Sequence, residues 1–101
     1  MINVIASIRI KDGRMSEFLE IFKSNIPNVL AEKGCLEYVP TLDVPAGLPV
    51  QVLDNNVVTI IEKWGSIEDL KAHLSAPHML AYKGKVADLV ENVTLKILAD
   101  A

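Results

Sequence analysis

Apolar and polar residues alternate along the N-terminal segment of the chain, with the two-residue period of a β-strand. One alternate set is entirely apolar: Ile2, Val4, Ala6, Ile8 and Ile10. The opposite set still contains Met1 and Ile5 among polar residues. A strand that is apolar on both faces needs at least partial cover on both sides. We therefore predict a strand over residues 1–10 in a sheet that is covered on both faces.

After the Asp12-Gly13 turn, the spacing of apolar residues changes to three and four, which predicts an amphipathic helix. The predicted buried stripe is Met15, Phe18, Leu19, Phe22, Ile26, Val29 and Leu30. Pro27 lacks a backbone donor, so the helix should kink or break near Asn25. Gly34 is expected to cap its C-terminus.

Two more strands follow, over residues 35–42 and 57–64. Tyr38 shares a face of the first with Leu36 and Leu42, and Pro40 favours an edge position or a bulge because proline cannot donate to a ladder. The second places Val58, Ile60, Glu62 and Trp64 on one face. Residues 43–56 between them form a long irregular loop, and such loops usually have a function or reach a partner.

The sequence of the C-terminal part, from Ser66 on, predicts a helix broken in two and then a last strand. Ser66 followed by Asp69 resembles a capping box, which predicts a helix to about Leu74. Pro77 suits the first turn of a second helix that continues to about Glu91. Its core stripe is Met79, Tyr82, Val86, Leu89 and Val90. Residues 92–98 form the last strand, with Val93, Leu95 and Ile97 directed inward.

The resulting order is β-α-β-β-α-β within one domain, residues 1–101. This is the split βαβ pattern of the ferredoxin-like α+β folds. Helices can cover only one face of such a sheet, and the other face still carries apolar residues. We therefore expect a homodimer in which a second copy covers that face.

Charge and composition exclude several classes of function. The net charge is −3 and the pI about 5.3, and no segment is basic enough for a nucleic-acid surface. No apolar run is long enough to span a membrane, and the N-terminus lacks a signal-type segment. The single cysteine, Cys35, excludes an internal disulfide and fits a reducing compartment. We expect a cytoplasmic protein.

Residues that could carry out chemistry concentrate in residues 62–82, which hold the only Trp and both histidines. His73 is either a partly exposed histidine at the boundary of its helix stripe or a general base. His78 is either satisfied by a local hydrogen bond or a neutral base near a helix N-terminus. Pro77 lies between the histidines, so one helix face cannot present both, and we expect no metal site.

Other residues of the same region could form a binding pocket. Tyr38 and Trp64 could form walls for a flat ring, although both residue types are more often core. If Glu62 lies on the helix-covered face it is buried and needs a partner, for which a histidine is the obvious candidate; if it is exposed, it is merely solvated. Met79 and Tyr82 are expected to line the core or the pocket.

Several segments together resemble the antibiotic biosynthesis monooxygenase family. They are the early strand, residues 32–38 (EKGCLEY), the strand end at residues 62–64 (EKW) and residues 70–82 (LKAHLSAPHMLAY). The resemblance implies a dimeric α/β barrel with a pocket between sheet and helices. It also implies oxidation of a quinol or polycyclic phenol by molecular oxygen, without metal, haem or flavin. Haem-degrading relatives use an Asn, a Trp and a His. The matching positions here are near Ala6, His73 and Lys83, so this chain lacks all three of these residues at those positions.

In the chemistry that the resemblance implies, His73 or His78 would remove a phenolic proton. Tyr38, Glu62, Trp64, Met79 and Tyr82 would contact the substrate. Two alternatives remain open: a non-oxidative enzyme such as an isomerase on the same scaffold, and a non-catalytic quinone-binding module. Anaerobic turnover distinguishes the isomerase from the oxygenase, and binding without turnover distinguishes the module.

Overall fold

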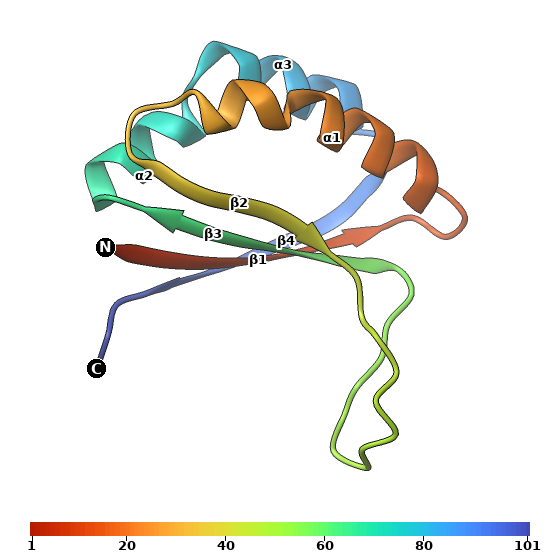
Figure 1. The fold of residues 1–101 in the computed structure, drawn as a ribbon. Coiled ribbons are helices and arrows are strands. Elements are labelled where there is room, and N and C mark those ends of the chain that lie inside the picture. The colour runs from red at the N-terminus through yellow and green to blue at the C-terminus, as the bar shows by residue number, and fades with distance from the viewer.

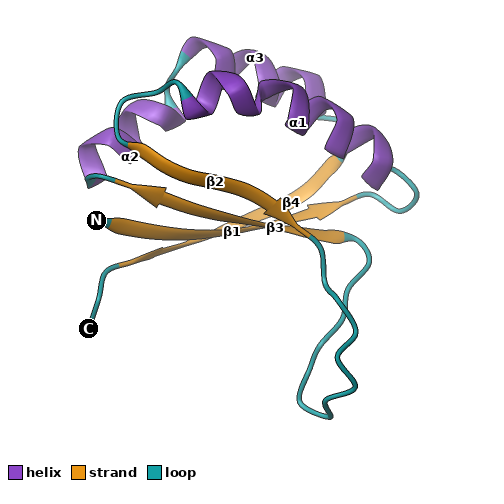
Figure 2. Ribbon diagram, in the orientation of Figure 1, coloured by secondary structure: helices purple, strands orange, loops and turns teal.

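The computed structural model describes all 101 residues as a four-stranded sheet with three helices. In chain order the elements are β1 (Ile2–Ile10), α1 (Met15–Leu30), β2 (Cys35–Thr41), β3 (Val57–Trp64), α2 (Ile67–Leu74), α3 (Pro77–Val86) and β4 (Val90–Leu98). All helices lie on one face of the sheet (Figures 1 and 2). The fold is therefore the α+β ferredoxin-like arrangement that the sequence predicts, with its second helix divided in two.

The strands are ordered β2-β3-β1-β4, and every neighbouring pair is antiparallel. β2 is an edge strand, as Pro40 predicts. Its register shift lies between Cys35 and Glu37, however, and not at Pro40. Leu36 lies in this shift and is 59% exposed, so it does not share the buried face of Tyr38 as expected.

The core lies between the sheet and the helices, and it contains the predicted alternating residues of the central strands. Val4, Ala6, Ile8 and Ile10 of β1 and Val58, Ile60, Glu62 and Trp64 of β3 are all buried. Phe18, Phe22 and Val29 of α1 pack against them. None of the three helices combines the length and the apolar character that a membrane-spanning helix requires.

The helix boundaries differ from the sequence predictions in two places. α1 continues unbroken through Pro27, because the proline lies near the helix end and buried Phe22 and Val29 hold the helix to the core on both sides of it. α1 then ends at Leu30, with Ala31 as its C-cap, and Gly34 lies beyond it. α3 ends at Val86, short of the expected residue 91, and β4 begins at residue 90.

Gly34 fixes the approach of α2 to the turn that follows α1. Its φ of +79° lies in the left-handed region, and a Cβ atom there would collide with the side chain of Asp69. The Gly65 amide donates to the Gly34 carbonyl at 2.8 Å, and the Ser66 side chain caps α2 through the Asp69 amide at 3.1 Å. The start of α2 is thus held against the segment between α1 and β2.

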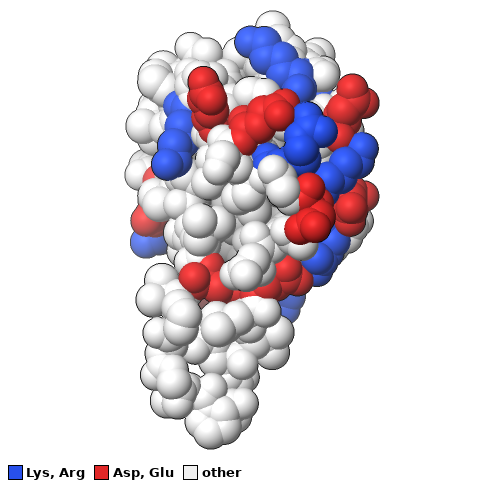
Figure 3. Space-filling model, turned by 90° about the vertical axis from the view of Figure 1, so that its right-hand side faces the viewer, with Lys and Arg blue, Asp and Glu red and all other residues white.

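The loop between β2 and β3 projects away from the sheet as an arm of residues 42–56 (Figure 1). Six of its apolar side chains are exposed: Leu42, Val44, Leu48, Val50, Val52 and Leu53. In Figure 3 the arm is the lower part of the molecule and carries almost no charge below its base. Asp54, near the base, pairs with Arg9 of β1 at 2.7 Å.

Candidate functional site

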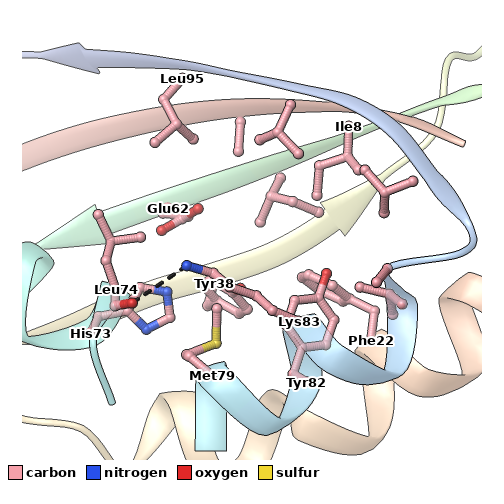
Figure 4. Close-up of a pocket in the computed structure, with 16 residues that line it drawn as sticks. Ile8, Phe22, Tyr38, Glu62, His73, Leu74, Met79, Tyr82, Lys83 and Leu95 are labelled. Carbon is pink, nitrogen blue, oxygen red and sulfur yellow. Dashed lines mark hydrogen bonds between the residues drawn. The ribbon is translucent and has the colours of Figure 1, made fainter. Parts of the chain in front are cut away.

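A cavity of about 440 Å³ opens between the sheet and the helices (Figure 4). Thirteen of its 16 lining residues are hydrophobic, and its size is within the usual range for a small-molecule site. The polar or titratable side chains that line it are Tyr38, Glu62, His73, Tyr82 and Lys83. They come from β2, β3, α2 and α3, so only the folded chain brings them together.

His73 lies in the last turn of α2, and only 1% of its surface is exposed. Its Nδ1 lies 2.7 Å from Oε2 of Glu32. A carboxylate can only accept, so Nδ1 carries the hydrogen, and Nε2 is left as the acceptor for the cavity. Burial lowers the pKa of His73, which keeps the ring neutral and able to take a proton. Of the two interpretations of His73, the one that makes it a partly exposed boundary residue is wrong about its exposure.

Glu32 is the first of two residues of this site that sequence reasoning missed. It follows α1, and its side chain is 16% exposed. The Gly34 contact with α2 brings it to His73, which is 41 residues away in the sequence. No local spacing could reveal this pair. The only available signal was that Glu32 begins one of the segments that carry the family resemblance.

His78 lies outside the main cavity and lines a separate hollow of about 160 Å³. The Asn25 side-chain amide nitrogen lies 3.2 Å from Nδ1 of His78, and Asn28 donates to the Asn25 carbonyl oxygen at 3.0 Å. Because Asn25 donates, Nδ1 of His78 accepts, and a neutral ring has its hydrogen on Nε2. Nε2 lies 3.3 Å from the same Glu32 oxygen. Despite this distance Nε2 makes no hydrogen bond.

Glu62 is buried on the helix-covered face, and its partner is Trp64 instead of the expected histidine. Trp64 Nε1 donates to Glu62 Oε1 at 2.9 Å. Burial raises the pKa of Glu62 and so favours the neutral acid, although the Trp64 hydrogen bond partly opposes this. Trp64 itself is fully buried behind the cavity and does not line it. It packs on His73, with the ring centres 4.6 Å apart.

Tyr38, Met79 and Tyr82 do line the cavity, as expected of substrate contacts. Tyr38 stacks on Phe22 with ring centres 5.4 Å apart, and Tyr82 packs edge-on against Phe22 at 5.8 Å. Burial raises the pKa of both tyrosines, so their hydroxyls stay protonated at neutral pH. These rings provide an aromatic lining with hydroxyl groups that can bond to a ligand oxygen.

Lys83 is the second residue that sequence reasoning left out of the site. It lines the cavity from α3, and its Nζ lies 3.5 Å from the Leu74 carbonyl oxygen, as the dashed line in Figure 4 shows. A signal was present in the sequence, because Lys83 follows Met79 by four residues and therefore shares its helix face.

No group of three or more His, Cys, Asp or Glu side chains is arranged to hold a metal ion. The absence of a metal or other cofactor from the reaction stays a prediction. Cys35 is a free, half-buried thiol, and burial is the main cause that raises its pKa. It is therefore poorly suited to act as a nucleophile.

Comparison with known proteins identifies the family. Over 100 residues the chain is 39% identical to the probable quinol monooxygenase YgiN of Escherichia coli (strain K12), covering 97% of this chain and 96% of the relative. A conserved protein from Methanosarcina mazei Go1 superposes with a TM-score of 0.84 at 21% identity, covering 99% of this chain and 92% of that one. The protein Rv0793 from Mycobacterium tuberculosis gives 0.81 at 24%, covering 99% and 94%. The family model for antibiotic biosynthesis monooxygenase matches residues 1–85, and the chain belongs to this family.

Proposed function

We propose that this protein is a cofactor-independent monooxygenase that oxidises a quinol or polycyclic phenol with molecular oxygen, and that His73 is its general base. The proposal extends to this chain the activity in the name of its 39% identical relative. The observation that carries the base assignment is the Glu32–His73 pair, which leaves a neutral imidazole nitrogen for an apolar cavity. The lining fits a flat aromatic ring, because most of it is hydrophobic and Phe22, Tyr38 and Tyr82 contribute rings.

The chemistry requires proton removal before electron transfer. A phenol gives electrons to oxygen more readily as its phenolate, so a base must take the hydroxyl proton. His73 Nε2 takes that proton, and the resulting imidazolium is stabilised by the carboxylate of Glu32 at Nδ1. All electrons come from the substrate. One oxygen atom of O₂ bonds to a ring carbon in place of that carbon's hydrogen. The other oxygen atom leaves as water with two hydrogens from the substrate, so that a quinol becomes a hydroxyquinone.

His78 has a supporting role in this proposal. Its Nδ1 accepts from Asn25, and its Nε2 lies 3.3 Å from Oε2 of Glu32, outside the main cavity. It is therefore a positioning residue beside Glu32, and it does not contact the substrate. Trp64 is likewise proposed to support Glu62 and His73 from behind, since it does not line the cavity.

The test is oxygen consumption with a panel of naphthoquinols and other polycyclic phenols, with mass analysis of the products. We expect enzyme-dependent oxygen uptake and a product that carries one added oxygen atom from labelled O₂. Each reaction is repeated without oxygen. Turnover under anaerobic conditions would instead support an isomerase, and tight quinone binding without turnover would support a binding module.

We also propose that the protein is a homodimer. Val39 and Ile61 on the helix-free face of the sheet are 42% and 37% exposed, and Ile61 pairs with both Val39 and Ile5. The apolar arm of residues 42–56 would add contact area on the same side of the sheet (Figure 1). Sedimentation equilibrium should give twice the chain mass of 11.1 kDa at micromolar concentration. A monodisperse monomer would contradict this proposal without affecting the assignment of the base.

A further inference from the structure

Lys83 is the only lysine or arginine that lines the cavity. Arg9, Arg14 and Lys63 pair with carboxylates, but Lys83 has no carboxylate partner. Its one hydrogen bond goes to the Leu74 carbonyl oxygen and is long, at 3.5 Å. An ammonium group has three donors, so Lys83 has donors left for a ligand.

The other titratable groups that face the cavity favour their neutral forms. Burial lowers the pKa of His73 and raises that of Glu62. Burial also raises the pKa values of Tyr38 and Tyr82. Glu32, from the turn after α1, lies behind His73 and does not line the cavity. Lys83 itself is exposed, so water screens its charge, but a cavity whose remaining charge is one cation still attracts an anion.

We propose that Lys83 is the counter-ion for the ionised oxygen of the ligand, so that the site binds phenolates in preference to neutral phenols. In Figure 4 the Lys83 ammonium and the His73 ring lie on the same side of the cavity. The charge of Lys83 also adds to the lowering of the His73 pKa, after burial and the charge of His78. The group that removes the proton and the cation that receives the resulting anion are therefore close together. The inference rests on one part of the proposed function, namely that the ligand of this cavity is a phenol.

The test measures ligand ionisation without oxygen or turnover. para-Nitrophenol is a suitable probe because its phenolate is yellow, and para-nitroanisole is a matched ring that cannot ionise. We expect wild-type protein to bind the nitrophenolate more tightly than the anisole and to lower the pKa of the bound phenol. Lys83→Met should weaken nitrophenolate binding about tenfold, equal to about 1.4 kcal/mol, and leave anisole binding unchanged.

Two further variants separate charge from other effects. Lys83→Arg keeps the cation and should retain most of the preference for the phenolate. Lys85→Met removes the same charge from the same helix but not from the cavity lining, and should behave as wild type. The inference is overturned if Lys83→Met binds nitrophenolate as wild type does, or if wild-type protein does not prefer nitrophenolate to nitroanisole. Because no quinol is oxidised in this assay, its outcome is independent of whether the protein is an oxygenase.

Discussion

The most direct test of the proposed base is Glu32→Gln. Gln has almost the same shape as Glu, so the change removes the negative charge 2.7 Å from His73 Nδ1 with little change in packing. Glu32 raises the pKa of His73 through its hydrogen bond and its charge, against the larger lowering by burial. Removing the carboxylate therefore lowers the pKa of His73 further. The ring then becomes a weaker base, and its imidazolium loses its counter-charge.

The size of the effect follows from the hydrogen bond that is lost. A hydrogen bond to a charged group contributes about 1.5–3 kcal/mol. If this hydrogen bond stabilises the enzyme only after His73 has taken the proton, its loss lowers kcat/KM by about 10- to 100-fold. A Gln amide can also donate to Nδ1 and so stabilise the wrong tautomer, which places the expected loss toward the upper end of this range.

The assay is the pH profile of quinol oxidation, whose acid limb reports the base in the free enzyme. Because the pKa of His73 falls in Glu32→Gln, the acid limb should move to lower pH while the plateau drops. Glu37→Gln is the matched control, since Glu37 undergoes the same chemical change on edge strand β2, where its 38% exposed side chain lies beside Lys63. A Glu32→Gln enzyme with wild-type kcat/KM and an unmoved acid limb would refute the dyad, provided that thermal unfolding shows an intact fold.

Two further predictions concern the histidines and Glu62. His73→Ala should reduce kcat by about 10²–10⁴-fold, and His78→Ala by less than about tenfold, in the same oxygen-uptake assay. Equal losses in both variants would contradict the separate roles, and Tm is measured alongside because the His73 ring is buried. Burial raises the pKa of Glu62, so wild-type stability should fall as pH rises from the unfolded-state pKa through the folded-state pKa. Glu62→Gln should lack this fall in urea denaturation across pH, and an identical pH dependence in both proteins would contradict the buried-acid interpretation.

The sheet was predictable because its signals are local. The alternation in β1 and β3 assigns the buried face residue by residue, and Val4, Ile60 and Trp64 are all buried as expected. Ser66 marks the start of α2 for the same reason, since its side chain caps the helix within three residues. The break expected at Pro27 did not occur, because the local loss of one donor is outweighed by packing of the residues around it.

The site was less predictable because its contacts join distant segments. His73 could be selected as a candidate from its type, but its burial depends on Glu32 and Trp64, which come from two other parts of the chain. Its helix position alone indicated a boundary residue. For Glu62 the sequence left burial open, and in the structure a neighbour on its own strand face satisfies the buried carboxyl group instead of a histidine.

β4 shows how the arrangement of helices affects the cavity. Val93 and Leu95 are directed toward the helices, since they pair with buried Ile8 and Ala6 of β1. They nevertheless stay 51% and 43% exposed, because β4 is the edge strand and no helix covers it there. The cavity is therefore open along an apolar wall, while its ionisable groups His73 and Glu62 are buried deep within it. In the proposed mechanism a flat apolar substrate would enter along β4 and expel water from His73, which would strengthen the interaction of its ionised oxygen with the charges around it.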